Sequence, residues 1–255
     1  MKLWLLSCLL LALSFAAPVR ADMASAIARV KPSVLLVGTF KRTSNPRFGL
    51  RGTGFVVLSG NLAITNAHVL PQAAEVDVDA SLVVQIRLSQ NEWQMRQAVV
   101  LEVDKIHDLA LLRFEGPPVA ALSVRDSANV REGQAVAFMG FPIGGALGFS
   151  PVTHRGMVSA ITPAALPVAS AQQLNEQVIR SMRGGSSFDI FQLDATAYPG
   201  NSGGPLFDPD SGEVLGVVNM VFIKGTKEAA LSSPSGITYA IPSSFVLQLL
   251  QRGSP

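Results

Sequence analysis

Short apolar segments separated by turn residues follow one another along most of the chain, whereas helical periodicity is rare. Segments of this length, bounded by Gly, Pro, Asn, Asp and Ser, predict β-strands, and their spacing favours a sandwich or barrel over alternating strands and helices. The segments are Val34–Phe40, Gly54–Leu58, Leu62–Thr65, Leu82–Leu88, Ala98–Val103, Leu109–Phe114, Ala135–Phe141, Met157–Ile161, Phe188–Leu193, Val214–Val221 and Ile237–Ile241. Roughly six strands are predicted before Pro117 and about as many after Gln134. The pattern predicts an all-β fold of two barrel-like halves, residues 22–126 and 127–255, joined around residues 116–133.

Three segments have helical character. Met23–Val30 is followed by Lys31-Pro32, and a proline at that point ends a helix. Ala171–Met182 lies in a long stretch without strand character. Ser243–Gln251 follows Pro242 and begins with two serines, which are good helix-capping residues. Its apolar face predicts a C-terminal helix and consists of Phe245, Val246, Leu249 and Leu250.

The first residues have the pattern of an export signal. Lys2 is followed by an apolar run over residues 3–17, and Val19-x-Ala21 supplies a cleavage site. We therefore expect a signal peptide over residues 1–21 and an exported, periplasmic or secreted, bacterial protein without stable membrane insertion after cleavage. The apolar run is shorter than the ~20 residues that a spanning helix needs, so a retained anchor is the weaker interpretation. Cys8 lies too early in the segment for a lipoprotein cleavage box.

Removal of the signal peptide changes what the composition excludes. Cys8 is the only cysteine, so the mature chain has no thiol nucleophile, no disulfide and no cysteine metal site. Lys2 and Arg20 also leave, and the mature chain then carries equal numbers of basic and acidic residues. No basic patch indicates nucleic-acid binding.

The stretch Tyr198–Leu206 places a serine, Ser202, between closely spaced glycines. Gly200 and Gly203 can adopt positive φ at little cost, so backbone N–H groups beside Ser202 can point toward one position. This geometry suits a nucleophile with an adjacent oxyanion hole. A hairpin turn that happens to contain a serine would have the same composition.

A serine nucleophile needs a base, and the chain has three histidines, His68, His107 and His154. All three precede Ser202, which excludes the α/β-hydrolase order, in which the histidine follows the serine. Only Asp22 precedes His68, so the subtilisin order lacks a suitable acid. The order His, Asp, Ser remains.

His68 and Asp108 are the best candidates for the partners of Ser202. His68 ends an apolar strand in a turn of small residues, and Asp108 leads directly into another apolar strand. An acid at the start of a buried strand needs a partner, for which a histidine N–H is suitable. Taken alone, His68 also fits a buried structural histidine, and Asp108 a turn residue that starts a strand.

The remaining acids and histidines are predicted to lie outside the site. Four acids stand in polar or alternating surroundings and are expected to be solvated: Asp77, Asp79, Glu102 and Asp104. His107 is expected to lie outside the triad, and His154, in a turn-like stretch beside Arg155, is expected at the surface.

Three motifs together resemble the trypsin-like serine proteases, and their details resemble the HtrA/Deg branch. The motifs are Thr65-Asn66-Ala67-His68-Val69, Asp108-Leu109-Ala110-Leu111-Leu112 and Gly200-Asn201-Ser202-Gly203-Gly204-Pro205-Leu206. Further matching stretches are Gly52-Thr53-Gly54-Phe55, Gly140-Phe141-Pro142-Ile143-Gly144, Gly156-Met157-Val158-Ser159-Ala160, Asp194-Ala195 and Tyr239-Ala240-Ile241-Pro242. The resemblance covers roughly residues 24–250.

The resemblance implies a chymotrypsin-like fold of two six-stranded antiparallel β-barrels, with the active site in the cleft between them. His68 and Asp108 would come from the first barrel and Ser202 from the second. The backbone of Gly200, Asn201 and Ser202 would form the oxyanion hole. Such a serine endopeptidase acts on protein or peptide substrates and needs no metal or cofactor. The sequence gives no indication of the oligomeric state.

The chain also departs from this branch. Its relatives usually carry PDZ domains after the protease, whereas this sequence stops soon after the predicted C-terminal helix, so we expect none. Thr196 stands six residues before Ser202, where a trypsin has an acid, which argues against cleavage after Lys or Arg. We expect a pocket for small or medium apolar side chains, lined by Thr196, Ala197, Val218, Asn219 and Met220.

A second hypothesis belongs to another class of function: a catalytically silent protease fold that serves as a binding or chaperone-like module. The presence of all three candidate catalytic residues argues against it, because simple binding requires none of them.

Overall fold

The computed structural model describes residues 22–71, 79–89, 92–142, 148–164, 188–219 and 236–253. The predicted signal peptide and the predicted helix Ala171–Met182 lie outside these residues.

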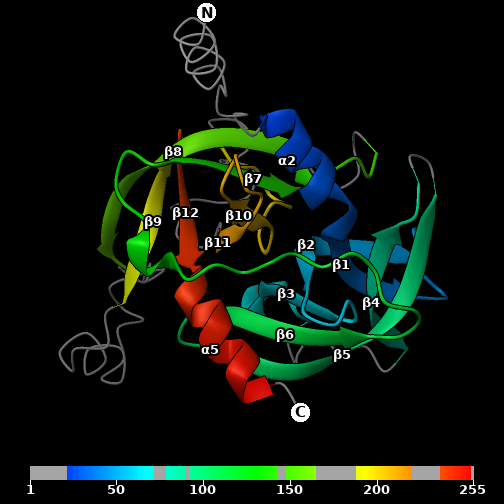
Figure 1. The fold of residues 1–255 in the computed structure, drawn as a ribbon. Coiled ribbons are helices and arrows are strands. Elements are labelled where there is room, and N and C mark those ends of the chain that lie inside the picture. Colours follow the sequence, from blue (N-terminus) through cyan, green and yellow to red (C-terminus); the bar gives the residue numbers. More distant parts are fainter. Residues whose placement is uncertain are drawn as a thin grey trace, which may run out of the picture.

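The first half of the described chain forms a closed antiparallel barrel with the strand order β1-β2-β3-β6-β5-β4 (Figure 1). Helix α2 (Met23–Val30) and the 3-10 turn η2 (Lys31–Ser33) precede it. Its strands are β1 (Val34–Lys41), β2 (Phe48–Val57), β3 (Leu62–Asn66), β4 (Ala80–Arg87), β5 (Trp93–Asp104) and β6 (Leu109–Phe114).

The second half forms another closed barrel, with the order β10-β11-β12-β9-β8-β7. Its strands are β7 (Ala135–Gly140), β8 (Val152–Pro163), β9 (Asp189–Asp194), β10 (Pro205–Phe207), β11 (Val214–Asn219) and β12 (Ile237–Pro242), and helix α5 (Ser243–Gly253) follows. The predicted all-β, double-barrel fold with a C-terminal helix is confirmed. The apolar pattern did not reveal β10, because three residues directly after a glycine-rich turn are too short to show alternation.

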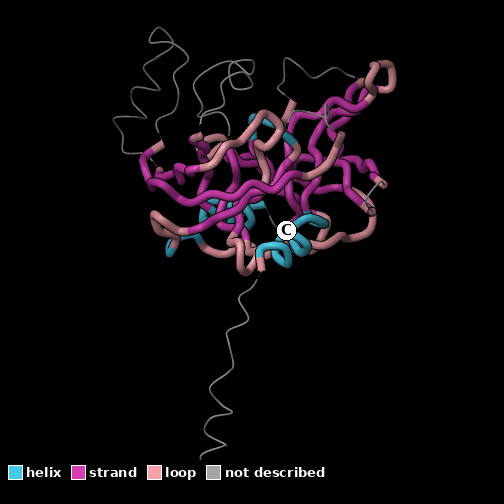
Figure 2. The backbone as a smooth tube through the Cα atoms, turned by 90° about the horizontal axis from the view of Figure 1, so that it is seen from above, coloured by secondary structure: helices cyan, strands magenta, loops and turns pink. Residues whose placement is uncertain are grey.

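One apolar cluster spans both barrels. The first barrel contributes Phe55, Ile64 and Leu109 to this cluster, and the second contributes Phe141 and Phe207, all nearly or fully buried. Because burial of each such side chain stabilises the fold by about 1.5–3 kcal/mol, the cluster holds the barrels in a fixed relation. Viewed from above, the strands form one continuous body with both described α-helices along one side (Figure 2).

The segment that connects the barrels, between β6 and β7, contacts both of them. Val57 forms an isolated bridge with Leu122, and Val124 forms another with Val214. The Ser243 hydroxyl, at the start of α5, donates to the Arg125 carbonyl at 2.5 Å. The predicted division at residues 126 and 127 falls within this connection, between β6 and β7.

Helix α5 packs back on β5 and β6 of the first barrel (Figure 1). The Asp104 carboxylate accepts hydrogen bonds from the His107 backbone N–H at 3.0 Å and from Arg252 Nη2 at 2.6 Å, and its Oδ2 lies 2.9 Å from His107 Nδ1. The His107 ring stacks on Phe245 of α5 with ring centroids 3.9 Å apart. The helix thereby anchors the turn that leads into Asp108.

The prediction that Asp104 is solvated is wrong, since its side chain is only 7% exposed. Burial alone would raise the pKa of Asp104, but the hydrogen bonds from His107 and Arg252 outweigh burial and lower the pKa to about 2. Asp104 is therefore ionised at neutral pH and acts as the acceptor that joins the β5–β6 turn to α5.

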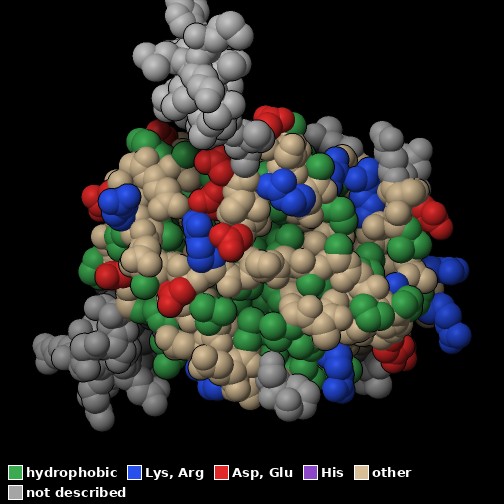
Figure 3. All heavy atoms as spheres, in the orientation of Figure 1, with side chains coloured by type: hydrophobic (Ala, Val, Ile, Leu, Met, Phe, Trp, Pro, Cys, Tyr) green, Lys and Arg blue, Asp and Glu red, His purple; other side chains and the backbone are tan. Residues whose placement is uncertain are grey.

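Acidic and basic side chains are both scattered over the face shown in Figure 3. Within the described residues, no helix is long and apolar enough to cross a membrane.

Candidate active site

His68 and Asp108 meet at one end of the first barrel. Antiparallel pairing of β3 with β6 places Asn66 opposite Leu109, so the residues just beyond these strand ends are neighbours. His68 lies in the 3-10 turn η3 (Ala67–Val69). Its backbone N–H donates to Asp108 Oδ1 at 2.8 Å, and its Nδ1 lies 2.6 Å from Asp108 Oδ2. A proton held on Nδ1 by the carboxylate leaves Nε2 free to act as a base.

The backbone around Asp108 is shaped for this contact. Asp108 has φ +51°, a left-handed conformation that aspartate adopts more readily than most residues. Its carbonyl accepts from the Ala67 N–H at 3.1 Å and from Asn66 Nδ2 at 3.0 Å. The Arg51 guanidinium donates to the Val69 and Leu70 carbonyls at 2.7 and 3.1 Å, which secures the other side of η3.

Asn219 adds a contact from the second barrel. Its Nδ2 donates to Asp108 Oδ2 at 2.7 Å, and its side chain is fully buried at the end of β11. Sequence reasoning assigned Asn219 and Val218 to a substrate pocket. The structure instead turns Asn219 toward Asp108 and buries Val218 in the core of the second barrel. Met220 lies outside the described residues.

Ser202 lies in a tightly bonded turn. The Asn201 N–H donates to the Tyr198 carbonyl at 3.0 Å, and Gly200 between them has φ +105°. With Pro199 at the second position, this geometry is that of a type II turn, which requires the positive φ of glycine. Within the described residues, the N–H groups of Gly200 and Ser202 have no backbone partner, whereas that of Asn201 is occupied. Gly200 and Ser202 therefore remain the possible oxyanion donors.

The serine turn is docked on the first barrel. The Thr53 N–H donates to the Ser202 carbonyl at 2.8 Å, and Thr53 Oγ1 donates to the Gly200 carbonyl at 2.6 Å. Gly203 lies against Thr65 and Asn66, which directly precede the η3 turn. Ser202, only 6% exposed, is thus held beside the segment that carries His68. The two barrels together bring the three predicted catalytic residues to one junction.

The match to a family model agrees with this arrangement: residues 52–217 match the trypsin-like peptidase domain. The chain belongs to the trypsin-like peptidase family. The matched segment includes His68, Asp108 and Ser202.

Relatives of this trypsin-like peptidase include HtrA-type serine proteases. Mitochondrial serine protease HTRA2 of Bos taurus is 32% identical over 203 residues, which cover 79% of this chain and 36% of the relative. A probable periplasmic DegP-like serine endoprotease of Marinomonas sp. is 28% identical over 216 residues, 84% of this chain and 38% of the relative. The chain thus spans less than half the length of these curated relatives. The HtrA-type protease AlgW, solved with a tripeptide, superposes with a TM-score of 0.64 at 26% identity, over 90% of this chain and 62% of AlgW.

His154, predicted in a turn-like stretch at the surface, lies instead within strand β8 and is partly buried. Its partly buried ring stacks on Phe138 with ring centroids 4.7 Å apart and an interplanar angle of 15°. Its Nε2 lies 3.4 Å from Asn201 Nδ2. The sequence could not show this, because the contact depends on the register of β7 and β8, which pairs Phe138 with His154.

The remaining predicted pocket residues lie just before the serine turn. Thr196 is half-buried, and Ala197 belongs to the core of the second barrel with 5% exposure. The assignment of these two residues to a substrate pocket stays a prediction.

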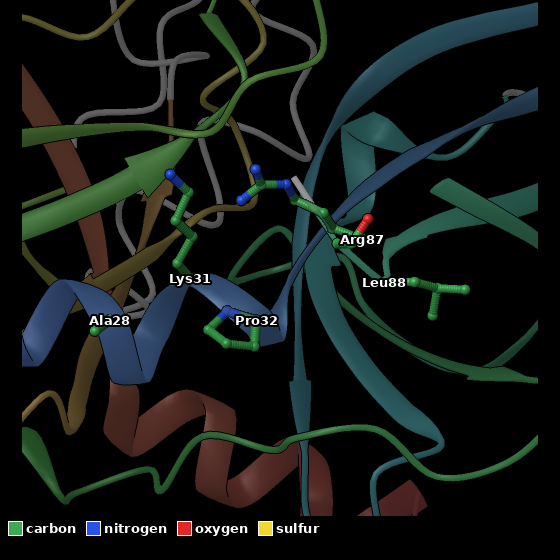
Figure 4. A pocket seen from close by; sticks show the side chains of 6 residues that line it. Ala28, Lys31, Pro32, Arg87 and Leu88 are labelled. Atoms are coloured by element: carbon green, nitrogen blue, oxygen red, sulfur yellow. The ribbon is translucent and has the colours of Figure 1, made fainter. Parts of the chain in front are cut away.

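A separate hollow of about 470 Å³ lies between the α2–η2 segment and β4, and its lining includes none of the predicted catalytic residues. The Lys31 and Arg87 side chains extend into the same region from its two sides (Figure 4). Among the described residues, no group of three or more His, Cys, Asp or Glu side chains is arranged to hold a metal ion.

Proposed function

We propose that this chain is a serine endopeptidase that hydrolyses peptide bonds in protein or peptide substrates. The observation that carries the proposal is the junction itself: His68 contacts Asp108 at 2.6 Å while the turn of Ser202 is docked beside them. Membership of the trypsin-like peptidase family and the HtrA-type relatives support it.

In the proposed mechanism, Ser202 Oγ attacks the carbonyl carbon of the scissile bond while His68 Nε2 takes the hydroxyl proton. Asp108 accepts from His68 Nδ1, which orients the ring and stabilises the imidazolium that forms. The backbone N–H groups of Gly200 and Ser202 bind the oxyanion. His68 then protonates the leaving amine, and water, activated by the same ring, hydrolyses the acyl-enzyme.

Asn219 would assist as a positioning residue. Its amide occupies one side of Asp108 Oδ2, and the His68 backbone N–H occupies Oδ1. Together these donors restrict rotation of the carboxylate, so Oδ2 faces His68 Nδ1. No metal or cofactor takes part in the proposed reaction.

We further propose that the enzyme is exported to the bacterial periplasm or secreted. The signal-like residues 1–21 and the periplasmic DegP-like relatives support this location. The mitochondrial HTRA2 relatives share the protease fold but come from another compartment.

A fluorophosphonate probe tests the proposed activity. We expect the purified protein to be labelled covalently at Ser202, because only an activated serine beside an oxyanion hole reacts readily. Ser202→Ala and the heat-unfolded protein are the controls, and neither should be labelled. Labelling of Ser202→Ala equal to that of the wild type would contradict the proposal. Absence of both labelling and casein hydrolysis in the folded wild type would also contradict it, and either result would favour the silent binding module.

The proposed specificity is for small or medium apolar residues before the scissile bond. Thr196 offers no charge to pair with a buried Lys or Arg, and an unpaired buried charge is strongly disfavoured. In a peptide library, we expect cleavage after Ala, Val or Leu to exceed cleavage after Lys or Arg by about tenfold or more. A cleavage profile dominated by Lys or Arg would contradict the assignment.

A further inference from the structure

Asn201, directly before the nucleophile, is the residue through which the serine turn is held together. Its N–H donates to the Tyr198 carbonyl, and its own carbonyl accepts from the Gly204 N–H, both at 3.0 Å. The peptide group between Asn201 and Ser202 carries the Ser202 N–H, one of the two proposed oxyanion donors. A change in the backbone torsions of Asn201 therefore moves that donor.

The side chain of Asn201 is fully buried. Its Oδ1 is buried without a hydrogen-bond partner and faces the backbone of Gly140, where an added Cβ would lie 2.7 Å away. Its Nδ2 lies 3.4 Å from His154 Nε2. Within the described residues, His154 is thus the one hydrogen-bond partner of this buried amide.

His154 is held in place for this contact by packing. Phe138 on β7 lies under its ring in a nearly parallel stack, and Tyr198 of the serine turn lies at a tilt 6.2 Å away. Burial lowers the pKa of His154 below its usual value, so the ring is neutral near pH 7. A neutral imidazole can offer Nε2 as the acceptor that the Asn201 amide needs.

We propose that His154 is a positioning residue of the active site, which holds the serine turn in its oxyanion-binding form through the Asn201 side chain. The proposal rests on the proposed serine-endopeptidase function. Without His154, both the Nδ2 and the Oδ1 of a buried amide would lack hydrogen-bond partners, which is energetically costly. A backbone rotation of the turn that brings the Asn201 amide to other partners or to solvent would then lower the free energy. Such a rotation displaces the Ser202 N–H, whereas His68 and Asp108 on the other barrel stay in place.

Two substitutions separate the hydrogen bond from the packing. His154→Phe keeps an aromatic ring over Phe138 but removes the nitrogen, and His154→Gln removes the ring but keeps polar atoms that can bond the Asn201 amide. We expect His154→Phe to lower kcat about tenfold, between the effect of one ordinary hydrogen bond and that of a lost oxyanion donor. The rate of Ser202 labelling by a fluorophosphonate should fall by a similar factor. KM should change by less than about twofold, and His154→Gln should recover most of the rate.

The measurements are kcat and KM on a p-nitroanilide peptide with an apolar residue before the cleaved bond, the fluorophosphonate labelling rate, and the midpoint of thermal unfolding. Wild-type kcat in His154→Phe overturns the proposal. Equal loss in both variants, in proportion to a lower unfolding midpoint, also overturns it, because the ring would then act only in packing. A rise in KM at unchanged kcat also overturns the proposal, because it would indicate that His154 contacts the substrate. If the wild type itself shows no Ser202-dependent turnover, the proposed function fails, and this inference fails with it.

Discussion

Replacing either Ser202 or His68 with alanine is expected to lower kcat/KM by about 10⁶-fold, and replacing both is expected to lower it little further. The two side chains act as one unit, since the histidine has no proton to take once the hydroxyl is gone. Asp108→Asn should cost about 10⁴-fold, because an amide at this position can favour the wrong tautomer of His68. Initial rates on casein or a p-nitroanilide peptide measure each variant.

Ser150→Ala is the matched control for the serine substitution. Ser150 is exposed and lies outside the proposed site, so its loss should leave turnover unchanged. Multiplicative losses in the double variant would contradict the prediction, because they would mean that His68 contributes independently of Ser202. All variants should unfold cooperatively at a midpoint close to that of the wild type, since Ser202 and His68 lie at the barrel junction and not in its apolar core.

Most of the fold could be predicted from the chain because each apolar segment overlaps an observed strand, although β2, β5 and β8 each begin several residues before the predicted segment. Helix α2 has the predicted bounds, and α5 starts at the predicted Ser243. Periodicity carries this information wherever a strand is long enough to show it. It failed for β10, which has three buried residues, and a fully buried strand such as β11 shows no alternation that would say where each side chain points.

The candidate site was only partly predictable for a related reason. His68, Asp108 and Ser202 follow from residue type, chain order and local motif. The contacts that hold them depend on which strand ends meet in space: Asn219 reaches Asp108 across the barrel junction, and His154 reaches Asn201 from β8. Neither contact has a local signal, since each joins residues far apart in the sequence.

The serine turn also depends on a glycine whose replacement is expected to have a large effect on stability. Gly203 has φ +84°, and an added Cβ would overlap the Thr53 carbonyl oxygen and the Thr65 hydroxyl. The Thr53 carbonyl already accepts from Thr65 Oγ1 at 2.7 Å, so neither atom can move without breaking that buried hydrogen bond. Gly203→Ala should therefore lower the free energy of unfolding by about 4 kcal/mol or more, as other severe overpacking does, and should abolish fluorophosphonate labelling.

Gly133→Ala separates the two causes of this loss of stability, which are the left-handed backbone conformation and the collision of the added Cβ. Gly133 has nearly the same conformation, φ +82°, but nothing lies within 4 Å of its added Cβ. It should show only the backbone cost of a left-handed alanine, about 1–2 kcal/mol, with full labelling of Ser202. Denaturant unfolding of both variants measures the difference, which we attribute to the collision with Thr53 and Thr65. Equal destabilisation would mean that the serine turn can move away from the first barrel, and the docking of Ser202 beside His68 would then not be rigid.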